Sequence, residues 1–315
     1  MNLTGVFVPL ITPFDTTGAV ALQALERLAH EVLDAGATGV LALGTTAEPS
    51  SLTVDEQRGI VDLLSRICRE RSAPLLVAAN TIAAVEALPA GVTATLSVVP
   101  PFLRPGEAGV IAHFAALSAA SPVPVVVYHV PYRTAQPLSA NSIRQLAALP
   151  NVAGLKHAVG GIDAATIDLM ADPPPGFSIL GGDDPFISPL LALGAHGGIL
   201  ASAHLATARF VELCDAWRAS DMARARSLGH RLAVLSSALF AEPNPTVIKA
   251  VLHARSRIPT PDVRLPLLSA DPGSLRCALA ADRAVSQHLD AGVSEGPRVD
   301  QLEVGAAVEQ PSPVA

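Results

Sequence analysis

GVFVPLITPF, residues 5–14, is followed by ALQALERLAHEVLDAG (21–36) and then by GVLALGTT (39–46). The first and third segments are short, rich in β-branched residues and apolar on both faces, which is typical of strands buried in a parallel sheet. The middle segment has the apolar pattern of a helix. The three segments therefore predict a β-α-β unit with parallel strands.

The same alternation continues along the chain. Six further strand-like runs follow: PLLVAAN (74–80), TATLSVVPP (93–101), PVVVYHVP (124–131), VAGLKHA (152–158), FSILGGDD (177–184) and GGILASA (197–203). Eight such units in about 200 residues predict an α/β fold of the (β/α)₈ TIM-barrel type. An open sheet with a nucleotide site would need a glycine fingerprint after the first strand, and ITPFDTTG (11–18) is not one. The segment 81–92 is short, so we expect a stunted helix there.

Only helical patterns follow the eighth strand. They cover 204–219, about 221–240, 244–254 and 272–289. We expect these helices to pack on the barrel. The predicted organisation is a catalytic barrel over 1–219, a C-terminal helical extension over 220–290, and a disordered tail over 291–315, which has little apolar periodicity.

Composition excludes several classes of function. With 315 residues, half of them hydrophobic, the chain can bury a large core, yet no apolar run is long enough to span a membrane. The N-terminus has no basic region typical of a signal peptide, and the three cysteines follow neither a metal-ligand nor a disulfide pattern. The net charge of −7, with no basic block, argues against nucleic acid and anionic membranes as partners. We therefore expect a cytoplasmic protein whose cysteines are free thiols.

Lys156 is an unusual residue for its position. The chain has only two lysines among its 21 basic residues, and this one stands inside the apolar run VAGLKHA. Desolvation on a strand lowers the pKa of a lysine from about 10.4, and a neutral amine can form a Schiff base with a carbonyl, which arginine cannot. The alternative is a structural lysine whose ammonium group pairs with Asp183 or Asp184. The residues alone leave both interpretations open.

Other polar residues stand at the ends of predicted strands, which converge on the mouth of a barrel. Tyr128 could shuttle protons beside a Schiff-base lysine, or be an ordinary core tyrosine. Thr45 and Thr46, in a GTT turn, could bind a carboxylate through N–H groups and hydroxyls, or belong to a plain turn. Arg133 could clamp a carboxylate with two hydrogen bonds, or be a solvated loop residue.

Two histidines and two glycine pairs carry weaker signals. Strand alternation points His129 and His157 away from the barrel interior, so we predict structural roles for both. The glycines at 181–182 and 197–198 lie where some barrels bind phosphate, but they also fall inside the strands. No group of His, Cys, Asp and Glu has the spacing of a metal site, so we expect no metal.

In this order and spacing, the motifs resemble those of the dihydrodipicolinate synthase / N-acetylneuraminate lyase family of class I, pyruvate-dependent aldolases. The resemblance runs from about residue 4 to 255. It rests on the opening GVFVPLITPF and on GTTAE (44–48), YHVPYRT (128–134), GLKHA (154–158), GGDD (181–184) and EPNPTVIKAVL (242–252). The last motif also accounts for Lys249, which we predict to be structural.

The resemblance implies a role for each site residue. Lys156 would form the Schiff base with pyruvate, Thr45 and Thr46 would bind the pyruvate carboxylate, and Tyr128 would relay protons with the Thr45 hydroxyl beside it. The imine would tautomerise to an enamine that attacks an aldehyde, without a metal or organic cofactor. Gly182 and Ile199 would line the substrate pocket, and Arg133 would bind the carboxylate of aspartate semialdehyde, the aldehyde of the synthase branch. The resemblance also implies a homo-oligomer, a dimer or a tetramer.

The chain departs from the family pattern at several positions. Phe102 stands where the synthase branch has a tyrosine donated across a dimer interface, and Ala47 and Pro49 replace the usual residues of the GTT turn motif. These changes leave the pyruvate half of the predicted site intact but put the aldehyde in doubt. A related aldolase or lyase using a sugar acid or another aldehyde is one alternative. A catalytically inactive barrel with a binding or regulatory role is another, against which Lys156 argues.

Overall fold

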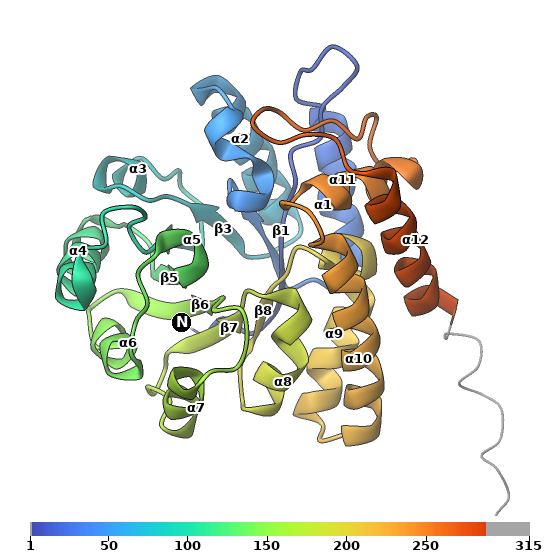
Figure 1. Cartoon of the computed structure of the whole chain (residues 1–315). Coiled ribbons are helices and arrows are strands. Elements are labelled where there is room, and N and C mark those ends of the chain that lie inside the picture. The colour runs from blue at the N-terminus through green and yellow to red at the C-terminus, as the bar shows by residue number, and fades with distance from the viewer. Residues whose placement is uncertain (1, 288–315) are drawn as a thin grey trace, which may run out of the picture.

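Eight parallel strands close into a barrel in sequence order, with β8 hydrogen-bonded to β1 (Figure 1). The computed structural model describes residues 2–287, so the predicted tail over 291–315 lies outside the described residues. The strands are β1 (Gly5–Pro9), β2 (Gly39–Ala42), β3 (Leu75–Ala78), β4 (Ala94–Val98), β5 (Val125–His129), β6 (Val152–His157), β7 (Ser178–Gly181) and β8 (Gly197–Ile199). The predicted (β/α)₈ barrel is confirmed.

Helices cover the outside of the barrel (Figure 1). They are α1 (Leu22–Asp34), α2 (Val54–Glu70), α3 (Ile82–Glu86), α4 (Gly106–Ala120), α5 (Pro131–Thr134), α6 (Ala140–Ala147), α7 (Ala164–Ala171) and α8 (Ile187–Ala192), with short 3₁₀ turns η1 (Thr45–Ala47), η2 (Pro49–Ser51) and η3 (Asp184–Phe186). As expected from the short segment 81–92, α3 has only five residues.

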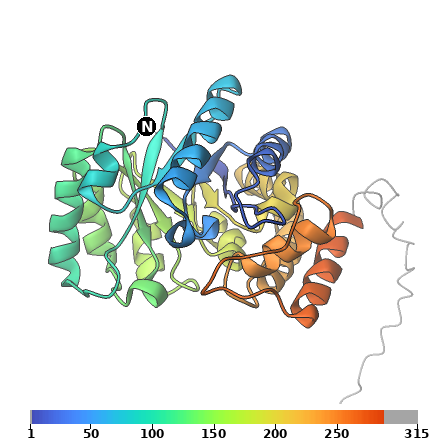
Figure 2. The ribbon, with the colours of Figure 1, turned by 90° about the horizontal axis from the view of Figure 1, so that it is seen from above.

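The predicted C-terminal helices are present as α9 (Ala203–Arg218), α10 (Met222–Leu239), α11 (Thr246–Ala254) and α12 (Pro272–Gln287). Figure 2 shows that the C-terminal helices gather on one side of the barrel. The backbone of α9 is kinked at Ala206, where φ is −134° and ψ is 41°. α9 packs against β1 and α10 packs against α9, so these helices lie against the barrel as expected.

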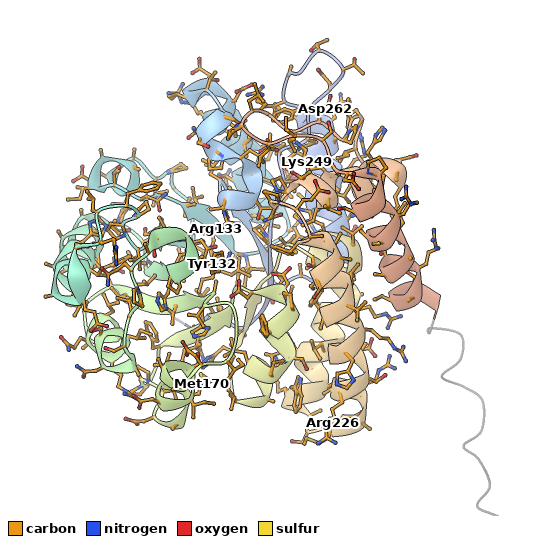
Figure 3. All side chains as sticks on the ribbon, viewed as in Figure 1. Tyr132, Arg133, Met170, Arg226, Lys249 and Asp262 are labelled. Atoms are coloured by element: carbon orange, nitrogen blue, oxygen red, sulfur yellow. The ribbon has the colours of Figure 1, made fainter. Side chains whose placement is uncertain are left out.

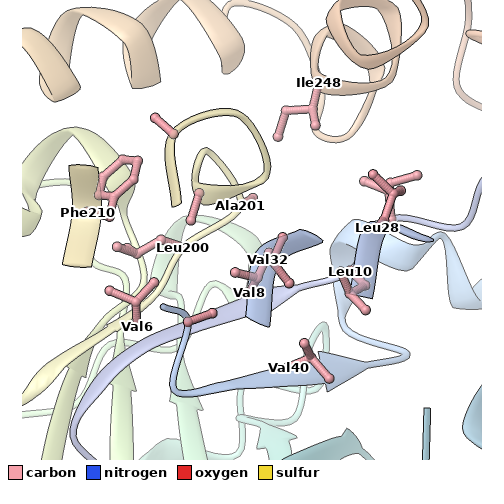
Figure 4. Packing of buried hydrophobic residues seen from close by; sticks show 14 of the residues in the cluster. Val6, Val8, Leu10, Leu28, Val32, Val40, Leu200, Ala201, Phe210 and Ile248 are labelled. Carbon is pink, nitrogen blue, oxygen red and sulfur yellow. The ribbon is translucent and has the colours of Figure 1, made fainter. Parts of the chain in front are cut away.

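Alternation along the strands divides the core into two layers. One set of strand residues packs against the surrounding helices, and Figure 4 shows part of this layer, with Val8 of β1, Val40 of β2 and Val32 of α1. The other set fills the barrel interior and includes Phe7, Leu41, Val126, Tyr128, Leu180 and Ile199. Side chains at the carboxyl end of the interior layer face the mouth of the barrel.

Candidate active site

The strand register brings Lys156 and Tyr128 together. In the sheet, Tyr128 of β5 is paired with Lys156 of β6, and Lys156 is paired with Leu180 of β7. Residues paired in register point to the same face of a sheet, and Tyr128 and Leu180 belong to the interior layer. Lys156 therefore points into the barrel, with Nζ 4.4 Å from the centroid of the Tyr128 ring.

Lys156 is buried without a counter-ion. Lys156 is only 5% exposed. Within residues 2–287, no carboxylate oxygen lies within 4.0 Å of Lys156 Nζ. Within the described residues, Lys156 therefore forms no ion pair with Asp183 or Asp184. Burial lowers the pKa of Lys156 to about 8; the negative charges of Asp184 and Asp183 oppose this shift, and the positive charge of Arg133 adds to it. More of this lysine is then neutral at pH 7 than of a lysine in water.

Tyr128 shares this buried environment. Burial raises the pKa of the Tyr128 phenol, while the positive charge of Arg133 and the neighbouring Thr45 side chain oppose the rise. The phenol thus remains protonated at neutral pH and can donate a proton to a group in the mouth. Thr45 is exposed at the start of η1, the turn that follows β2.

Two acidic residues follow β7 and have different surroundings. Asp184 is fully buried, and its Oδ2 accepts a hydrogen bond from the Ser202 N–H at 2.5 Å. Burial raises the pKa of Asp184 to about 6, against the opposing effects of Ser202 and Lys156. Asp183 is half-buried and accepts hydrogen bonds from the Gly160 N–H at 2.5 Å and the Tyr132 hydroxyl at 3.2 Å.

The GTT turn forms the 3₁₀ turn η1, whose first N–H groups have no partner inside the turn. Such N–H groups can bind a carboxylate. The Thr46 hydroxyl accepts a hydrogen bond from Asn244 Nδ2 at 2.9 Å, which leaves its own proton and a second lone pair for a ligand. The structure thus places Thr45 and Thr46 next to each other in η1 and bonds Thr46 to Asn244, a contact that the sequence did not reveal.

Glu48 and Lys249 form a buried ion pair behind this turn. Lys249 Nζ lies 2.8 Å from Glu48 Oε1, and its side chain is 0% exposed. The other Glu48 oxygen accepts a hydrogen bond from the Arg264 N–H at 2.8 Å. Glu48 itself has left-handed backbone angles, with φ 55° and ψ 42°. Lys249 thus has the structural surroundings that we predicted, while its partner Glu48 was not identified from the sequence.

Arg133 lies on α5 beside Tyr132, with its guanidinium carbon 5.9 Å from the centroid of that ring (Figure 3). The side chain is exposed, and its positive charge lowers the pKa of both Tyr128 and Lys156. Arg133 therefore faces the same mouth, where a positive charge can attract an acidic substrate.

Gly182 and Ile199 contribute space and an apolar wall. A Cβ at Gly182 would lie 2.7 Å from Lys156 Cε, so this glycine leaves the room that the lysine side chain occupies. Ile199, at the end of β8, is buried in the interior layer. A Cβ at Gly197 would lie 1.9 Å from the Gly5 carbonyl oxygen, so that glycine permits close approach of β8 to β1.

His129 and His157 point to the helices, as predicted. His129 Nε2 accepts a hydrogen bond from the Leu138 N–H, and His157 Nε2 lies 3.0 Å from the Thr166 hydroxyl. Both rings are buried, and burial lowers the pKa of each. They support the wall behind Tyr128 and Lys156.

The part of the chain from residue 2 to 287 holds no group of three or more His, Cys, Asp or Glu side chains arranged to bind a metal ion. In the same described region, none of the helices combines the length and the apolar character needed to cross a membrane.

These features define a (β/α)₈ barrel with a lysine, a tyrosine and a threonine-bearing turn gathered at the carboxyl ends of its strands. Residues 2–277 match the dihydrodipicolinate synthetase family, and the chain belongs to this family. It is 35% identical over 292 residues to a 4-hydroxy-tetrahydrodipicolinate synthase of Neisseria meningitidis serogroup C, a match that covers 90% of this chain and 99% of the relative. It is 34% identical to 4-hydroxy-tetrahydrodipicolinate synthase 2 of Clostridium acetobutylicum, covering 85% of this chain and 95% of the relative.

Solved structures are similar over the same region. The dihydrodipicolinate synthase of Thermotoga maritima has a TM-score of 0.84 and 28% identity, covering 90% of this chain and 99% of that one. The chloride-inhibited dihydrodipicolinate synthase of Acinetobacter baumannii, solved in complex with pyruvate, has a TM-score of 0.82 and 30% identity, covering 89% of this chain and 99% of that one.

Proposed function

We propose that the protein is a class I aldolase that joins pyruvate to an aldehyde through a Schiff base on Lys156. One observation carries the proposal: Lys156 is buried without a counter-ion at the mouth of the barrel, and burial lowers its pKa to about 8. Such a lysine supplies a neutral amine near neutral pH, which a salt-bridged lysine would not.

The surrounding residues fit the steps of this chemistry. The first N–H groups of η1, with the Thr45 and Thr46 hydroxyls, would hold the pyruvate carboxylate, so that the keto carbon faces Lys156 Nζ. Attack gives a carbinolamine, whose hydroxyl leaves as water with a proton from Tyr128. Loss of a methyl proton from the resulting imine gives the enamine, and its carbon attacks the aldehyde. The protonated imine acts as the electron sink, so these steps need no metal or organic cofactor.

We propose aspartate semialdehyde as the aldehyde, which would make the protein a 4-hydroxy-tetrahydrodipicolinate synthase acting in lysine biosynthesis. The names of the relatives in Neisseria and Clostridium support this choice. Arg133 supports it as well, because its guanidinium group at the mouth could bind the second carboxylate. One observation favours a different aldehyde: Phe102 carries no hydroxyl and lies 89% exposed, with φ 68°.

Trapping with borohydride tests the proposal. The protein is incubated with pyruvate, reduced, digested and mapped by mass spectrometry. Lys249 is a control within the same chain, since it is buried and paired with Glu48. We expect an adduct on Lys156 and none on Lys249. If folded protein with excess pyruvate gives no adduct on Lys156, the aldolase proposal fails and an inactive barrel with a binding role takes its place.

We also propose that the protein works as a homo-oligomer, either a dimer or a tetramer. The loop after β4 supports contact between copies, because Phe102 and Leu103 are 89% and 81% exposed there. Exposed apolar side chains of this size side by side are typical of protein interfaces. Light scattering of the wild type and of Phe102→Asp checks this: the variant should dissociate into smaller species.

A further inference from the structure

Arg264 joins three segments of the chain next to the turn η1. It lies in the segment 255–271, which links α11 to α12 and passes beside α2 (Figure 1). Its guanidinium group pairs with Glu56 of α2 through two hydrogen bonds: Nη1 donates to Oε2 at 2.8 Å, and Nη2 donates to Oε1 at 2.6 Å. The same two nitrogens donate to the Ser51 carbonyl at 2.9 Å and to the Gly18 carbonyl at 2.8 Å. A planar fork with this many partners has one well-defined position.

A buried aromatic ring holds the face of the same guanidinium group. The Arg264 guanidinium carbon lies 4.4 Å from the centroid of the Phe14 ring, and Lys249 Nζ lies 4.0 Å from that centroid. Phe14 is only 1% exposed, and a cation over such a ring is attracted to it. The hydrogen bonds from Arg264 lower the pKa of Glu56 to about 2, so this carboxylate stays charged at neutral pH. Arg264 is therefore held by its edge and by its face.

Arg264 holds both ends of the short segment that follows η1. Its backbone N–H donates to Glu48 Oε2, and its side chain donates to the Ser51 carbonyl. Glu48 ends η1 with a φ of 55°, and Leu43, just before the turn, also has a φ of 55°. Left-handed backbone at residues other than glycine is strained and persists only where the surroundings hold it. Arg264 and Lys249 supply that hold on the Glu48 side, because each of them binds one of the two Glu48 oxygens.

We propose that Arg264 is a positioning residue for the substrate carboxylate. By holding Glu48 and Ser51, it keeps the N–H groups and hydroxyls of Thr45 and Thr46 in the arrangement that binds a carboxylate. The inference rests on the proposed function, because that carboxylate belongs to pyruvate. Arg264 acts through η1 and not by contact with the substrate. A turn that is already ordered binds its ligand with a smaller loss of conformational entropy, so the effect should be on affinity.

The pyruvate dependence of borohydride trapping tests this role in Arg264→Met and Arg264→Lys. We expect Arg264→Met to raise the half-saturating pyruvate concentration about tenfold, the effect of losing one hydrogen bond to a charged group. Its maximal trapping rate should stay within about twofold of the wild-type rate, because the lost interaction concerns binding. Arg264→Lys keeps the charge without the fork and should raise the half-saturating concentration about threefold. It also provides the measurement if Arg264→Met does not fold.

Arg257→Met is the matched control, because Arg257 belongs to the same segment but holds a different part of the barrel. Its guanidinium group donates to Glu31 Oε2 at 2.7 Å and to the His204 carbonyl at 2.6 Å. The control should lower the melting temperature and leave the half-saturating concentration at the wild-type value. The inference is overturned if the Arg264 variants change only the melting temperature. It is also overturned if Arg257→Met raises the half-saturating concentration as much as Arg264→Met does.

Hydrogen–deuterium exchange of the peptide that contains residues 44–52 tests the same hold without pyruvate. Arg264→Met should speed amide exchange in this peptide about tenfold, because the turn opens more often, whereas Arg257→Met should leave it unchanged. Unchanged exchange in both Arg264 variants overturns the inference. If the wild type gives no trapped adduct, the proposed function fails, whereas faster exchange in the Arg264 variants would still show that Arg264 orders η1.

Discussion

Gly182→Ala would place a methyl group against the proposed reactive lysine. The added Cβ would lie 2.7 Å from Lys156 Cε, 2.8 Å from Cγ and 3.1 Å from Ala158 Cβ. Carbon atoms in contact normally lie about 3.5–4.0 Å apart, so the lysine side chain must move by about 1 Å. Gly182 does not have a positive φ, so alanine is compatible with its backbone and the substitution tests this contact alone.

The expected effect follows from that displacement. Overpacking a core by one methyl group costs about 1–3 kcal/mol of stability. Misplacing a reacting atom by about 1 Å costs about 100-fold in rate, which corresponds to about 2.7 kcal/mol of activation free energy. We therefore expect Gly182→Ala to remain folded with a lower melting temperature, and to form the trapped pyruvate adduct about 100 times more slowly than the wild type.

The assay is the rate of borohydride-trapped adduct at saturating pyruvate, measured beside a thermal melt. Gly161→Ala is the matched control, because a Cβ at Gly161 has no atom within 4 Å and this glycine also lacks a positive φ. The control should trap at the wild-type rate. A folded Gly182→Ala protein that traps as fast as the wild type would refute the reasoning, since Lys156 would then not react from the position described.

Three further predictions concern charge. The trapping rate should rise as pH increases through about 8, because only neutral Lys156 attacks pyruvate. Asp184→Asn should move the midpoint of that pH profile downward, because the negative charge of Asp184 raises the pKa of Lys156. Lys249→Met should lower the free energy of unfolding by about 3–5 kcal/mol in urea titrations, because it leaves Glu48 buried without its partner. Burial lowers the pKa of His204 to about 4, so the unfolded chain takes up a proton first as pH falls from about 6.5. His204 should therefore contribute a loss of stability of about 1.4 kcal/mol for each unit of falling pH between these values, and melts across that range should show a pH dependence smaller by this amount for His204→Gln than for the wild type.

The barrel could be predicted because its signals are local. Each strand-like run and each helical pattern is contained within a short stretch, and eight of them in alternation leave few folds to choose from. The interior position of Lys156 could also be predicted, since strand ends meet at one mouth. Whether its ammonium group pairs with Asp183 or Asp184 could not be predicted, because an ion pair depends on a few ångströms of side-chain placement that residue order does not contain. Tyr132 was overlooked for a related reason: its partner Asp183 lies 51 positions away.

The C-terminal extension contacts the residues that shape the mouth. Asn244 reaches Thr46 across 198 positions, Lys249 reaches Glu48 across 201, and the Arg264 N–H reaches Glu48 across 216. A buried ion pair gives little net stability on its own, because desolvation of both charges offsets their attraction. Its effect here is geometric: Glu48 keeps a left-handed backbone at the end of η1 while both of its oxygens are held by residues of the extension. The strands thus supply Lys156 and Tyr128, whereas the C-terminal extension supplies the contacts that hold the threonine turn in place. A barrel without this extension would contain the predicted site residues but would lack the support for their arrangement.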